Sequence, residues 1–215
     1  MTKPRVILAD DHSLILAGMR KLVEEECEVV GMVEDGRALV EAAQTLRPDL
    51  ILMDISMPLL NGLEAARQLG KLVPESKLIF LTMHASPTYA TEAFQAGASG
   101  YLLKRSAASE LRQAIQSVLQ GQHYLTPLIT KDVLDSVLKP STGERGKPTS
   151  TALTARQREV LQLVAEGRST KEIATILSVS VKTVEFHKSR IMQQLDIHTT
   201  ADLTKYSITH GITGL

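Results

Sequence analysis

Five short runs of β-branched and aliphatic residues recur along the first half of the chain, separated by stretches with helical periodicity. The runs are Arg5–Ala9, Val29–Val33, Leu50–Met53, Leu78–Leu81 and Tyr101–Leu103. Each run is almost continuously apolar, which indicates strands buried on both faces, as in a parallel sheet covered by helices on each side. The sequence therefore predicts an α/β unit with a five-stranded parallel sheet.

A change of composition marks the end of this unit. Its last predicted helix, Ser106–Leu119, stops before Gly121, a residue type that favours helix ends. The pattern then allows a short helix at Thr130–Leu138, and Lys139–Ser150 reads as a linker because it holds two prolines, two glycines and almost nothing apolar. We expect domains at residues 1–122 and 151–215, joined by a linker over 123–150.

Every segment beyond the linker has helical character. The predicted helices are Thr154–Glu166, Ser169–Leu177, Val181–Leu195 and Thr200–Ile208. The first two begin with capping-box patterns, in which a hydroxyl residue is followed three positions later by Gln or Glu. The sequence predicts a small all-α domain of four helices.

Composition excludes several classes of protein. A chain of 215 residues that is 43% hydrophobic is long enough and apolar enough to fold. Its formal net charge of zero gives no overall attraction to nucleic acid or membrane, so a basic surface has to be local. The single cysteine, Cys27, excludes an internal disulfide, and the chain start lacks the apolar core of a signal peptide. With no apolar run of bilayer length, we expect a cytoplasmic protein without membrane contact.

Polar side chains follow four of the predicted strands. They are Asp10 and Asp11, Asp54, Thr82 and Lys104. In parallel α/β sheets ligands bind at the carboxyl ends of the strands, so these groups are expected to converge. Each residue taken alone favours the explanation of an ordinary strand-end residue, but the four strand ends together favour a site.

Carboxylates that converge repel one another unless a cation lies among them. An oxygen-only ligand set with no His or Cys nearby favours Mg²⁺. We expect Asp11, Asp54 and the Ser56 carbonyl to bind it directly, and Asp10 through water. An aspartate in this position is also able to attack a phosphoryl donor and form an acyl phosphate. Asp54 is the predicted nucleophile, with Lys104 and Thr82 contacting the transferred oxygens.

The motifs VILADDH, LILMDISMPLLNGLEA, LIFLTMHAS and GASGYLLKRS resemble the response-regulator receiver domain, from Pro4 to about Gln122. The resemblance implies a flavodoxin-like fold and a sensor histidine kinase as phosphoryl donor. We expect the protein not to be an enzyme. By the same resemblance Asp54 is the phosphoacceptor, Asp10 and Asp11 form the acidic pocket, Lys104 binds phosphate, and Thr82 and Tyr101 are switch residues. A half-exposed strand tyrosine is the alternative for Tyr101.

Further positions match or depart from this family. Pro58 and Gly62 match the loop after the phosphoacceptor, where the glycine is expected to permit a turn. Arg105 and Met83 replace the proline and the small residue that many receivers carry. Ser56 and His84, two positions after Asp54 and Thr82, are expected to tune the rate of dephosphorylation.

The third C-terminal helix carries an apolar stripe of Val184, Ile191 and Leu195 that leaves its polar residues on other faces. Charge and periodicity alone favour a DNA-reading face and a solvated face equally. The segment LTARQREVLQLVAEGRSTKEIATILSVSVKTVEFHKSRIMQQLDIHTTADL resembles the LuxR-type helix-turn-helix of the NarL/FixJ response regulators, from Leu153 to about Ile208. The resemblance makes Val181–Leu195 the recognition helix.

The expected DNA contacts divide into two sets. Phosphate contacts are assigned to Lys182, Thr183, Lys188 and Arg190, and base contacts to Glu185, Phe186 and Ser189. We expect a homodimer on double-stranded promoter DNA, with Thr200–Ile208 either a dimer helix or part of the core.

The sequence thus predicts a phosphorylation-controlled transcription regulator. The main alternative is a DNA-binding regulator whose receiver pocket is vestigial. A phosphatase that turns over at Asp54 needs a general acid beside the nucleophile, and the sequence offers none. The receiver motifs argue against a lactone-sensing regulator, which carries the same C-terminal module.

Overall fold

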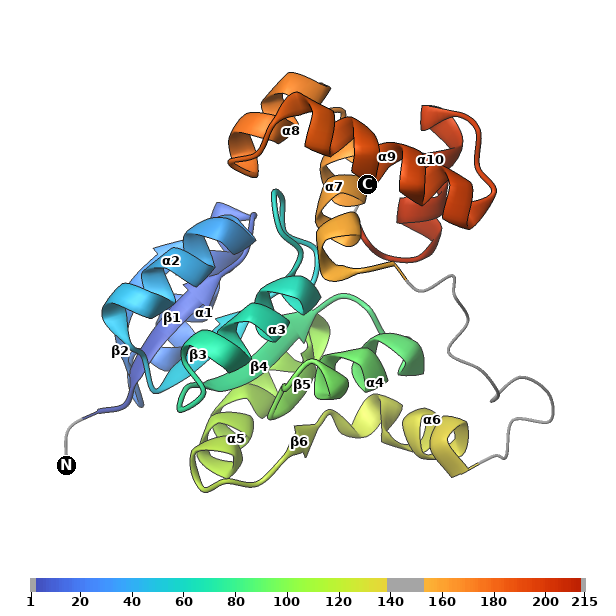
Figure 1. Cartoon of the computed structure of the whole chain (residues 1–215). Coiled ribbons are helices and arrows are strands. Elements are labelled where there is room, and N and C mark those ends of the chain that lie inside the picture. The colour runs from blue at the N-terminus through green and yellow to red at the C-terminus, as the bar shows by residue number, and fades with distance from the viewer. Residues whose placement is uncertain (1–2, 139–152, 214–215) are drawn as a thin grey trace. The chain divides into compact units, whose positions relative to one another are not determined.

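The computed structural model describes residues 3–138 and 153–213, so the predicted linker Lys139–Ser150 lies outside the described residues. The chain divides into two compact units. One contains the described strands, and the other contains the last four labelled helices (Figure 1). No helix in the described ranges combines the length and apolar character needed to cross a bilayer.

The N-terminal unit is built on a parallel sheet. Its strands are β1 (Arg5–Ala9), β2 (Glu28–Val33), β3 (Leu50–Met53), β4 (Lys77–Thr82), β5 (Gly100–Leu103) and β6 (Tyr124–Leu125). Their order across the sheet is β2-β1-β3-β4-β5-β6, and every pair is parallel. The predicted parallel architecture is confirmed.

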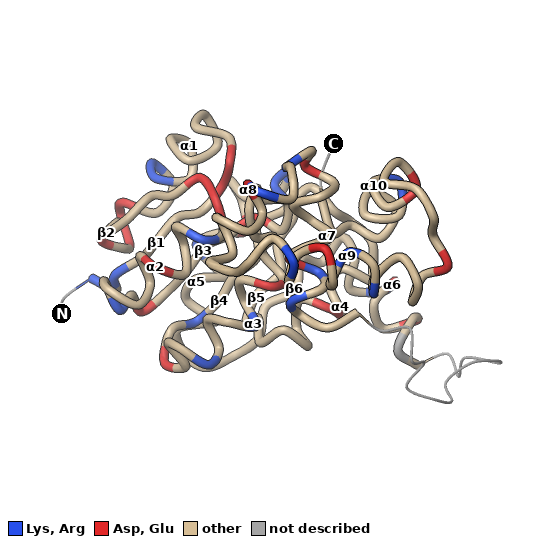
Figure 2. Tube along the Cα trace, turned by 45° about the horizontal axis from the view of Figure 1, so that its top comes forward, with Lys and Arg blue, Asp and Glu red and all other residues tan. Residues whose placement is uncertain are grey.

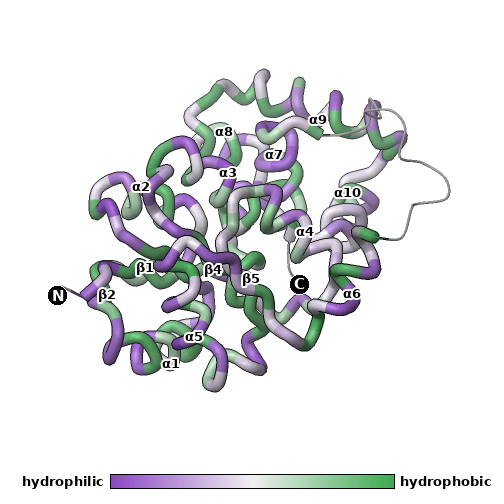
Figure 3. Tube along the Cα trace, turned by 90° about the horizontal axis from the view of Figure 1, so that it is seen from below, coloured by the Kyte–Doolittle hydropathy of each residue, from purple (hydrophilic) through white to green (hydrophobic). Residues whose placement is uncertain are grey.

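Helices cover both faces of this sheet (Figure 1). They are α1 (Ser13–Val23), α2 (Gly36–Leu46), α3 (Gly62–Leu72), α4 (Pro87–Gln95) and α5 (Ala107–Leu119). Helices α1 and α5 contact each other on one face, and α2, α3 and α4 follow one another on the opposite face. Alternate strand residues such as Val6 and Leu52 pack with Leu16 of α1 and Leu111 of α5 in one core cluster. The bands of hydrophobic and hydrophilic residues along α2 and α5 are visible in Figure 3.

The predicted number of strands was wrong, because β6 adds a sixth strand to the described sheet beside β5. A two-residue strand is too short to show periodicity, so only its pairing partner identifies it. Helix α6 (Pro127–Leu138) follows at once and begins three residues before the predicted Thr130. Gly121 has φ +82°, as expected for a glycine that follows a helix end.

The C-terminal unit consists of helices in its described part: α7 (Ala155–Ala165), α8 (Thr170–Ile176), α9 (Val181–Leu195) and α10 (Thr200–Thr209). Both predicted capping boxes are present, at Thr154 and at Ser169. The hydroxyl of Ser180 caps α9 by accepting from the Thr183 N–H. The core contains residues from each of the helices, among them Val160, Ile173, Val184, Ile191 and Leu203.

Candidate functional site

The sheet brings the four predicted strand ends to one edge. Strands β1, β3, β4 and β5 are consecutive neighbours, and all run in the same direction. The backbone N–H of Asp54 donates to the Ala9 carbonyl at 2.9 Å, and that of Asp10 donates to the Val33 carbonyl at 3.1 Å. These bonds extend the sheet pairing by one residue and hold the two aspartates side by side.

Lys104 joins two of the carboxylates. Its Nζ lies 2.7 Å from Oδ2 of Asp10 and 2.8 Å from Oδ2 of Asp54, and its side chain is only 10% exposed. Burial by itself lowers the pKa of Lys104, but its hydrogen bonds and charge interactions with Asp10 and Asp54 outweigh burial and raise the pKa. The ammonium group therefore stays charged and compensates two buried anions.

Asp11 lies at the more exposed side of this cluster, next to His12. Nδ1 of His12 is 2.8 Å from Oδ1 of Asp11 and 3.3 Å from Oδ1 of Asp10, and one donor atom from each of the three lies within 4.8 Å of the others. The donor set fits a divalent cation. The premise that no histidine stands near these carboxylates was wrong, although His12 directly follows the two aspartates in the sequence.

A chain of polar contacts connects Ser56, His84 and Tyr101. Oγ of Ser56 and Nε2 of His84 are 2.9 Å apart, and the His84 ring stacks on Tyr89 with a centroid distance of 4.3 Å. The Tyr101 hydroxyl donates to the His84 carbonyl at 2.8 Å. The pKa of His84 is lowered, chiefly because burial disfavours the charged ring and further because Lys104 is nearby, against the opposing charge of Asp54.

Thr82, the last residue of β4, and Tyr101, the second residue of β5, are fully buried. The His84 N–H lies 3.3 Å from Oγ1 of Thr82, which accepts from it. Burial is the main cause that raises the pKa of Tyr101, so the ring keeps its proton. The alternative of a half-exposed strand tyrosine does not apply to Tyr101.

Position 62 requires glycine because a side chain there would collide with the neighbouring backbone. A Cβ at this position would meet the Asp54 carbonyl oxygen at 2.1 Å and the Ile55 Cα at 3.0 Å. Its φ is not positive, so the expected turn conformation is not the reason for glycine here. The start of α3 instead packs directly against the backbone of the predicted phosphoacceptor.

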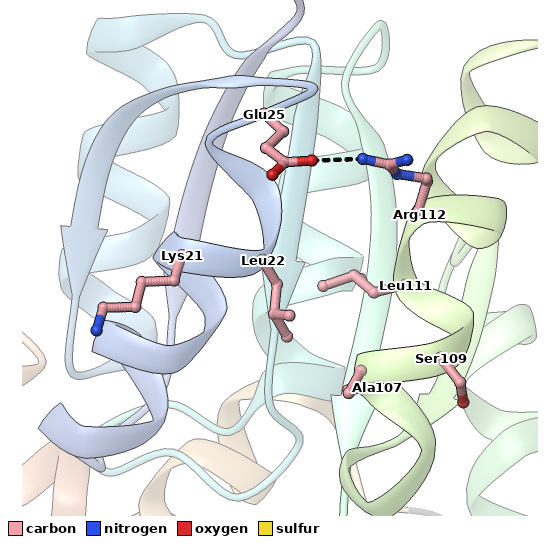
Figure 4. Close-up of a pocket in the computed structure, with 8 residues that line it drawn as sticks. Lys21, Leu22, Glu25, Ala107, Ser109, Leu111 and Arg112 are labelled. Carbon is pink, nitrogen blue, oxygen red and sulfur yellow. Dashed lines mark hydrogen bonds and ion pairs between the residues drawn. The ribbon is translucent and has the colours of Figure 1, made fainter.

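A pocket of about 370 Å³ lies between α1 and α5 (Figure 4). Its rim includes Arg112, whose Nη2 pairs with Oε2 of Glu25 at 2.6 Å, and Leu111 points toward Leu22 across the gap. None of its lining residues belongs to the predicted site. The acidic cluster, not this pocket, is therefore the candidate reaction site.

The polar face of α9 is open to solvent. The residues of the predicted DNA interface that are exposed are Lys182, Glu185, Phe186, Ser189 and Arg190, while Thr183 and Lys188 are half-buried. Val184 and Ile191 are buried, as the apolar stripe predicted. Lysine and arginine are interspersed with acidic residues along the described chain (Figure 2).

Several of these residues have partners within the unit. The Arg190 guanidinium lies over the Phe186 ring, 5.4 Å from its centroid. Nζ of Lys188 lies 3.1 Å from Oγ1 of Thr200, at the start of α10. In α10 itself Leu203 is fully buried and Tyr206 packs against the core, so these two residues fit the core-packing alternative.

Comparison with known protein families matches two separate segments of the chain. Residues 6–116 match the family described as the response regulator receiver domain, and residues 151–207 match bacterial regulatory proteins of the luxR family. Among relatives, the transcriptional regulatory protein MctR of Rhizobium johnstonii is 35% identical over 98% of this chain and 95% of its own length. The response regulator UvrY of Escherichia coli is 35% identical over 96% and 94%.

Solved structures of response regulators are also similar to this chain. A structure of the Salmonella typhimurium RcsB response regulator covers 100% of both chains with a TM-score of 0.65 and 29% identity. RcsB from Salmonella enterica serovar Typhimurium, bound to promoter rprA in the presence of phosphomimetic BeF₃⁻, covers 95% of this chain and 98% of its own with a TM-score of 0.57 and 30% identity.

Proposed function

Because the chain belongs to the NarL/FixJ family of two-component response regulators, with a receiver and a LuxR-type DNA-binding domain, we propose that phosphorylation of Asp54 controls its binding to promoter DNA. The observation that carries this proposal is the joint placement of Asp10, Asp54 and Lys104, which forms a compensated anionic site at the carboxyl edge of the sheet. A sensor histidine kinase is the proposed donor.

In the proposed reaction an Asp54 carboxylate oxygen forms a bond to phosphorus, while the bond from phosphorus to the donor nitrogen breaks and its electron pair stays on nitrogen. The Lys104 ammonium group, whose Nζ lies 2.8 Å from Oδ2 of Asp54, contacts the oxygens of the transferred group and balances their charge. The Thr82 hydroxyl donates to one of them. Asp11, Asp54 and the Ser56 carbonyl would hold Mg²⁺, with Asp10 acting through water, and the ion would supply positive charge to the same oxygens.

The DNA-binding step is assigned to α9. Lys182, Thr183, Lys188 and Arg190 contact phosphates, and Glu185, Phe186 and Ser189 face base edges. Support comes from the exposure of five of these residues and from RcsB, a relative in structure that has been solved with promoter DNA. A homodimer is the proposed DNA-binding form, since two helices one helical turn apart read a longer site than one.

Acetyl phosphate supplies a direct test. The full chain incubated with Mg²⁺ and acetyl phosphate should gain one phosphoryl group by intact mass, and its affinity for selected promoter DNA should rise. Asp54→Ala should abolish both effects. DNA binding that is equal with and without phosphorylation would support the alternative of a vestigial receiver.

A further inference from the structure

His12 stands at the acidic cluster with its imidazole directed at two carboxylates. Nδ1 lies 2.8 Å from Oδ1 of Asp11 and 3.3 Å from Oδ1 of Asp10. The backbone N–H of His12 also donates to Oδ1 of Asp10 at 3.0 Å, which fixes the turn that carries the ring. Three possible donors thus come from three consecutive residues.

These separations match neighbouring positions of one coordination sphere. Two ligand atoms that are each about 2.1 Å from an ion and at right angles lie about 3.0 Å apart. The two distances from Nδ1 lie on either side of that value. The other oxygen of Asp10, Oδ2, is the one that pairs with Lys104, so Oδ1 faces the histidine.

We propose that His12 binds the divalent cation of the acidic site through Nδ1, so that the site prefers first-row transition ions such as Co²⁺ to Mg²⁺. This inference rests on the proposed function, which places a divalent cation there. Imidazole nitrogen strengthens the binding of Co²⁺, Ni²⁺ and Zn²⁺ and adds little for Mg²⁺, which prefers oxygen ligands and retains water. The side chain is 66% exposed, so an ion can reach it from solvent.

An ordinary ion pair at the start of a helix is the competing explanation of the short distance to Asp11. That explanation predicts that the loss of the ring has no effect on the choice of metal. A nitrogen ligand predicts a selective loss, in which Co²⁺ binding falls and Mg²⁺ binding is kept.

The test uses the full chain and the variant His12→Asn. Asparagine is a favoured N-cap, and His12 is the N-cap of α1, so the variant keeps the helix start. Co²⁺ affinity is measured by calorimetry and by the visible absorption of the bound ion, and Mg²⁺ affinity by competition with Co²⁺. His123→Asn is the matched control, because His123 is exposed and follows α5, away from the strand ends that carry the carboxylates.

Wild type should bind Co²⁺ at least about tenfold more tightly than Mg²⁺, and His12→Asn should lose about tenfold in Co²⁺ affinity with a change in Mg²⁺ affinity below about threefold. The visible ligand-field absorption of bound Co²⁺ should also change in His12→Asn and not in His123→Asn. An unaltered ratio of the two affinities in His12→Asn overturns the role of His12 while Mg²⁺-dependent labelling of Asp54 still stands. Absence of binding by either ion overturns the metal requirement of the proposed function as well.

Discussion

Lys104 and Asp54, fifty positions apart in the chain, form an ion pair of 2.8 Å at the carboxyl edge of the sheet. Asp10 shares the same ammonium group at 2.7 Å. The receiver thus holds a positive charge between two buried carboxylates.

Lys104→Met should bind Mg²⁺ more tightly than wild type, by about tenfold, because the cation then becomes the only compensation for the two carboxylates. Labelling by acetyl phosphate should nevertheless be slower, since the ammonium no longer reaches the transferred oxygens. Calorimetry and intact mass measure the two effects. Lys71→Met, which removes an exposed lysine of α3, is the control and should change neither. Equal Mg²⁺ affinity in wild type and Lys104→Met would contradict the compensating role.

Gly62→Ala should destabilise the receiver by about 1–3 kcal/mol, because the new methyl group collides with the Asp54 carbonyl oxygen. Gly70→Ala in the same helix is the matched control. Its Cβ meets nothing within 4 Å, so alanine should stabilise the helix by about 0.5–1 kcal/mol. Urea unfolding measures both, and effects of the same sign would refute the steric explanation.

Cys27 should make stability depend on alkaline pH. Burial, the main cause, raises the pKa of its thiol from 9.0 to about 11. Below pH 9 the thiol is protonated in both states, whereas above it the unfolded chain ionises first, so stability falls as the pH approaches 11. The stability advantage of wild type over Cys27→Ala should shrink by about 1.4 kcal/mol per pH unit in this window. Urea titrations at pH 8, 9 and 10 measure the stability of both proteins. A difference in stability between them that stays constant over this range would disprove the raised pKa of Cys27. The tyrosines are common to both proteins and cancel.

Ser180→Ala should lower the stability of the C-terminal unit by about 1 kcal/mol, because α9 loses the hydroxyl that accepts from the Thr183 N–H. Ser180→Asp keeps an acceptor at the cap and should stay close to wild type. Thermal unfolding followed by circular dichroism compares them. If Ser180→Asp lowers the stability as much as Ser180→Ala does, loss of the cap is not the cause of the destabilisation.

Lys182→Ala should reduce the slope of log affinity for DNA against log salt concentration by about 1, as expected for one lost phosphate contact. Lys182 is exposed at the start of α9. Lys205→Ala, on the exposed side of α10, removes the same charge away from the proposed groove-facing helix and serves as control. Salt titrations of binding to one DNA duplex give the slopes, and no difference between the two variants would remove Lys182 from the interface.

Strand positions could be predicted from the sequence because apolar runs buried on both faces leave a direct signal. The predicted runs at Arg5–Ala9 and Leu50–Met53 coincide with β1 and β3, and the helix over Val181–Leu195 coincides with α9. The capping residues Thr154, Ser169 and Ser180 were predictable for a related reason, since a cap involves only near neighbours in the chain.

Features that depend on distant contacts could not be predicted in this way. Gly62 was expected to serve a turn, but its neighbours across the loop determine that only glycine fits. The Arg190–Phe186 contact follows from side-chain rotamers that no spacing rule fixes. His12 is different, because it adjoins Asp10 and Asp11, so the sequence itself places three possible metal ligands together.

The two-residue strand β6 pairs with the outer side of β5. The N–H of Tyr124 donates to the Ser99 carbonyl and that of Thr126 to the Tyr101 carbonyl, so β5 is not an open edge. Short edge strands offer an incoming chain little backbone on which to template further strands. A receiver cut at residue 122, where composition places its end, would expose the apolar β5 along its whole length. Such a fragment should self-associate through strand addition, whereas one that extends to residue 138 should remain monodisperse.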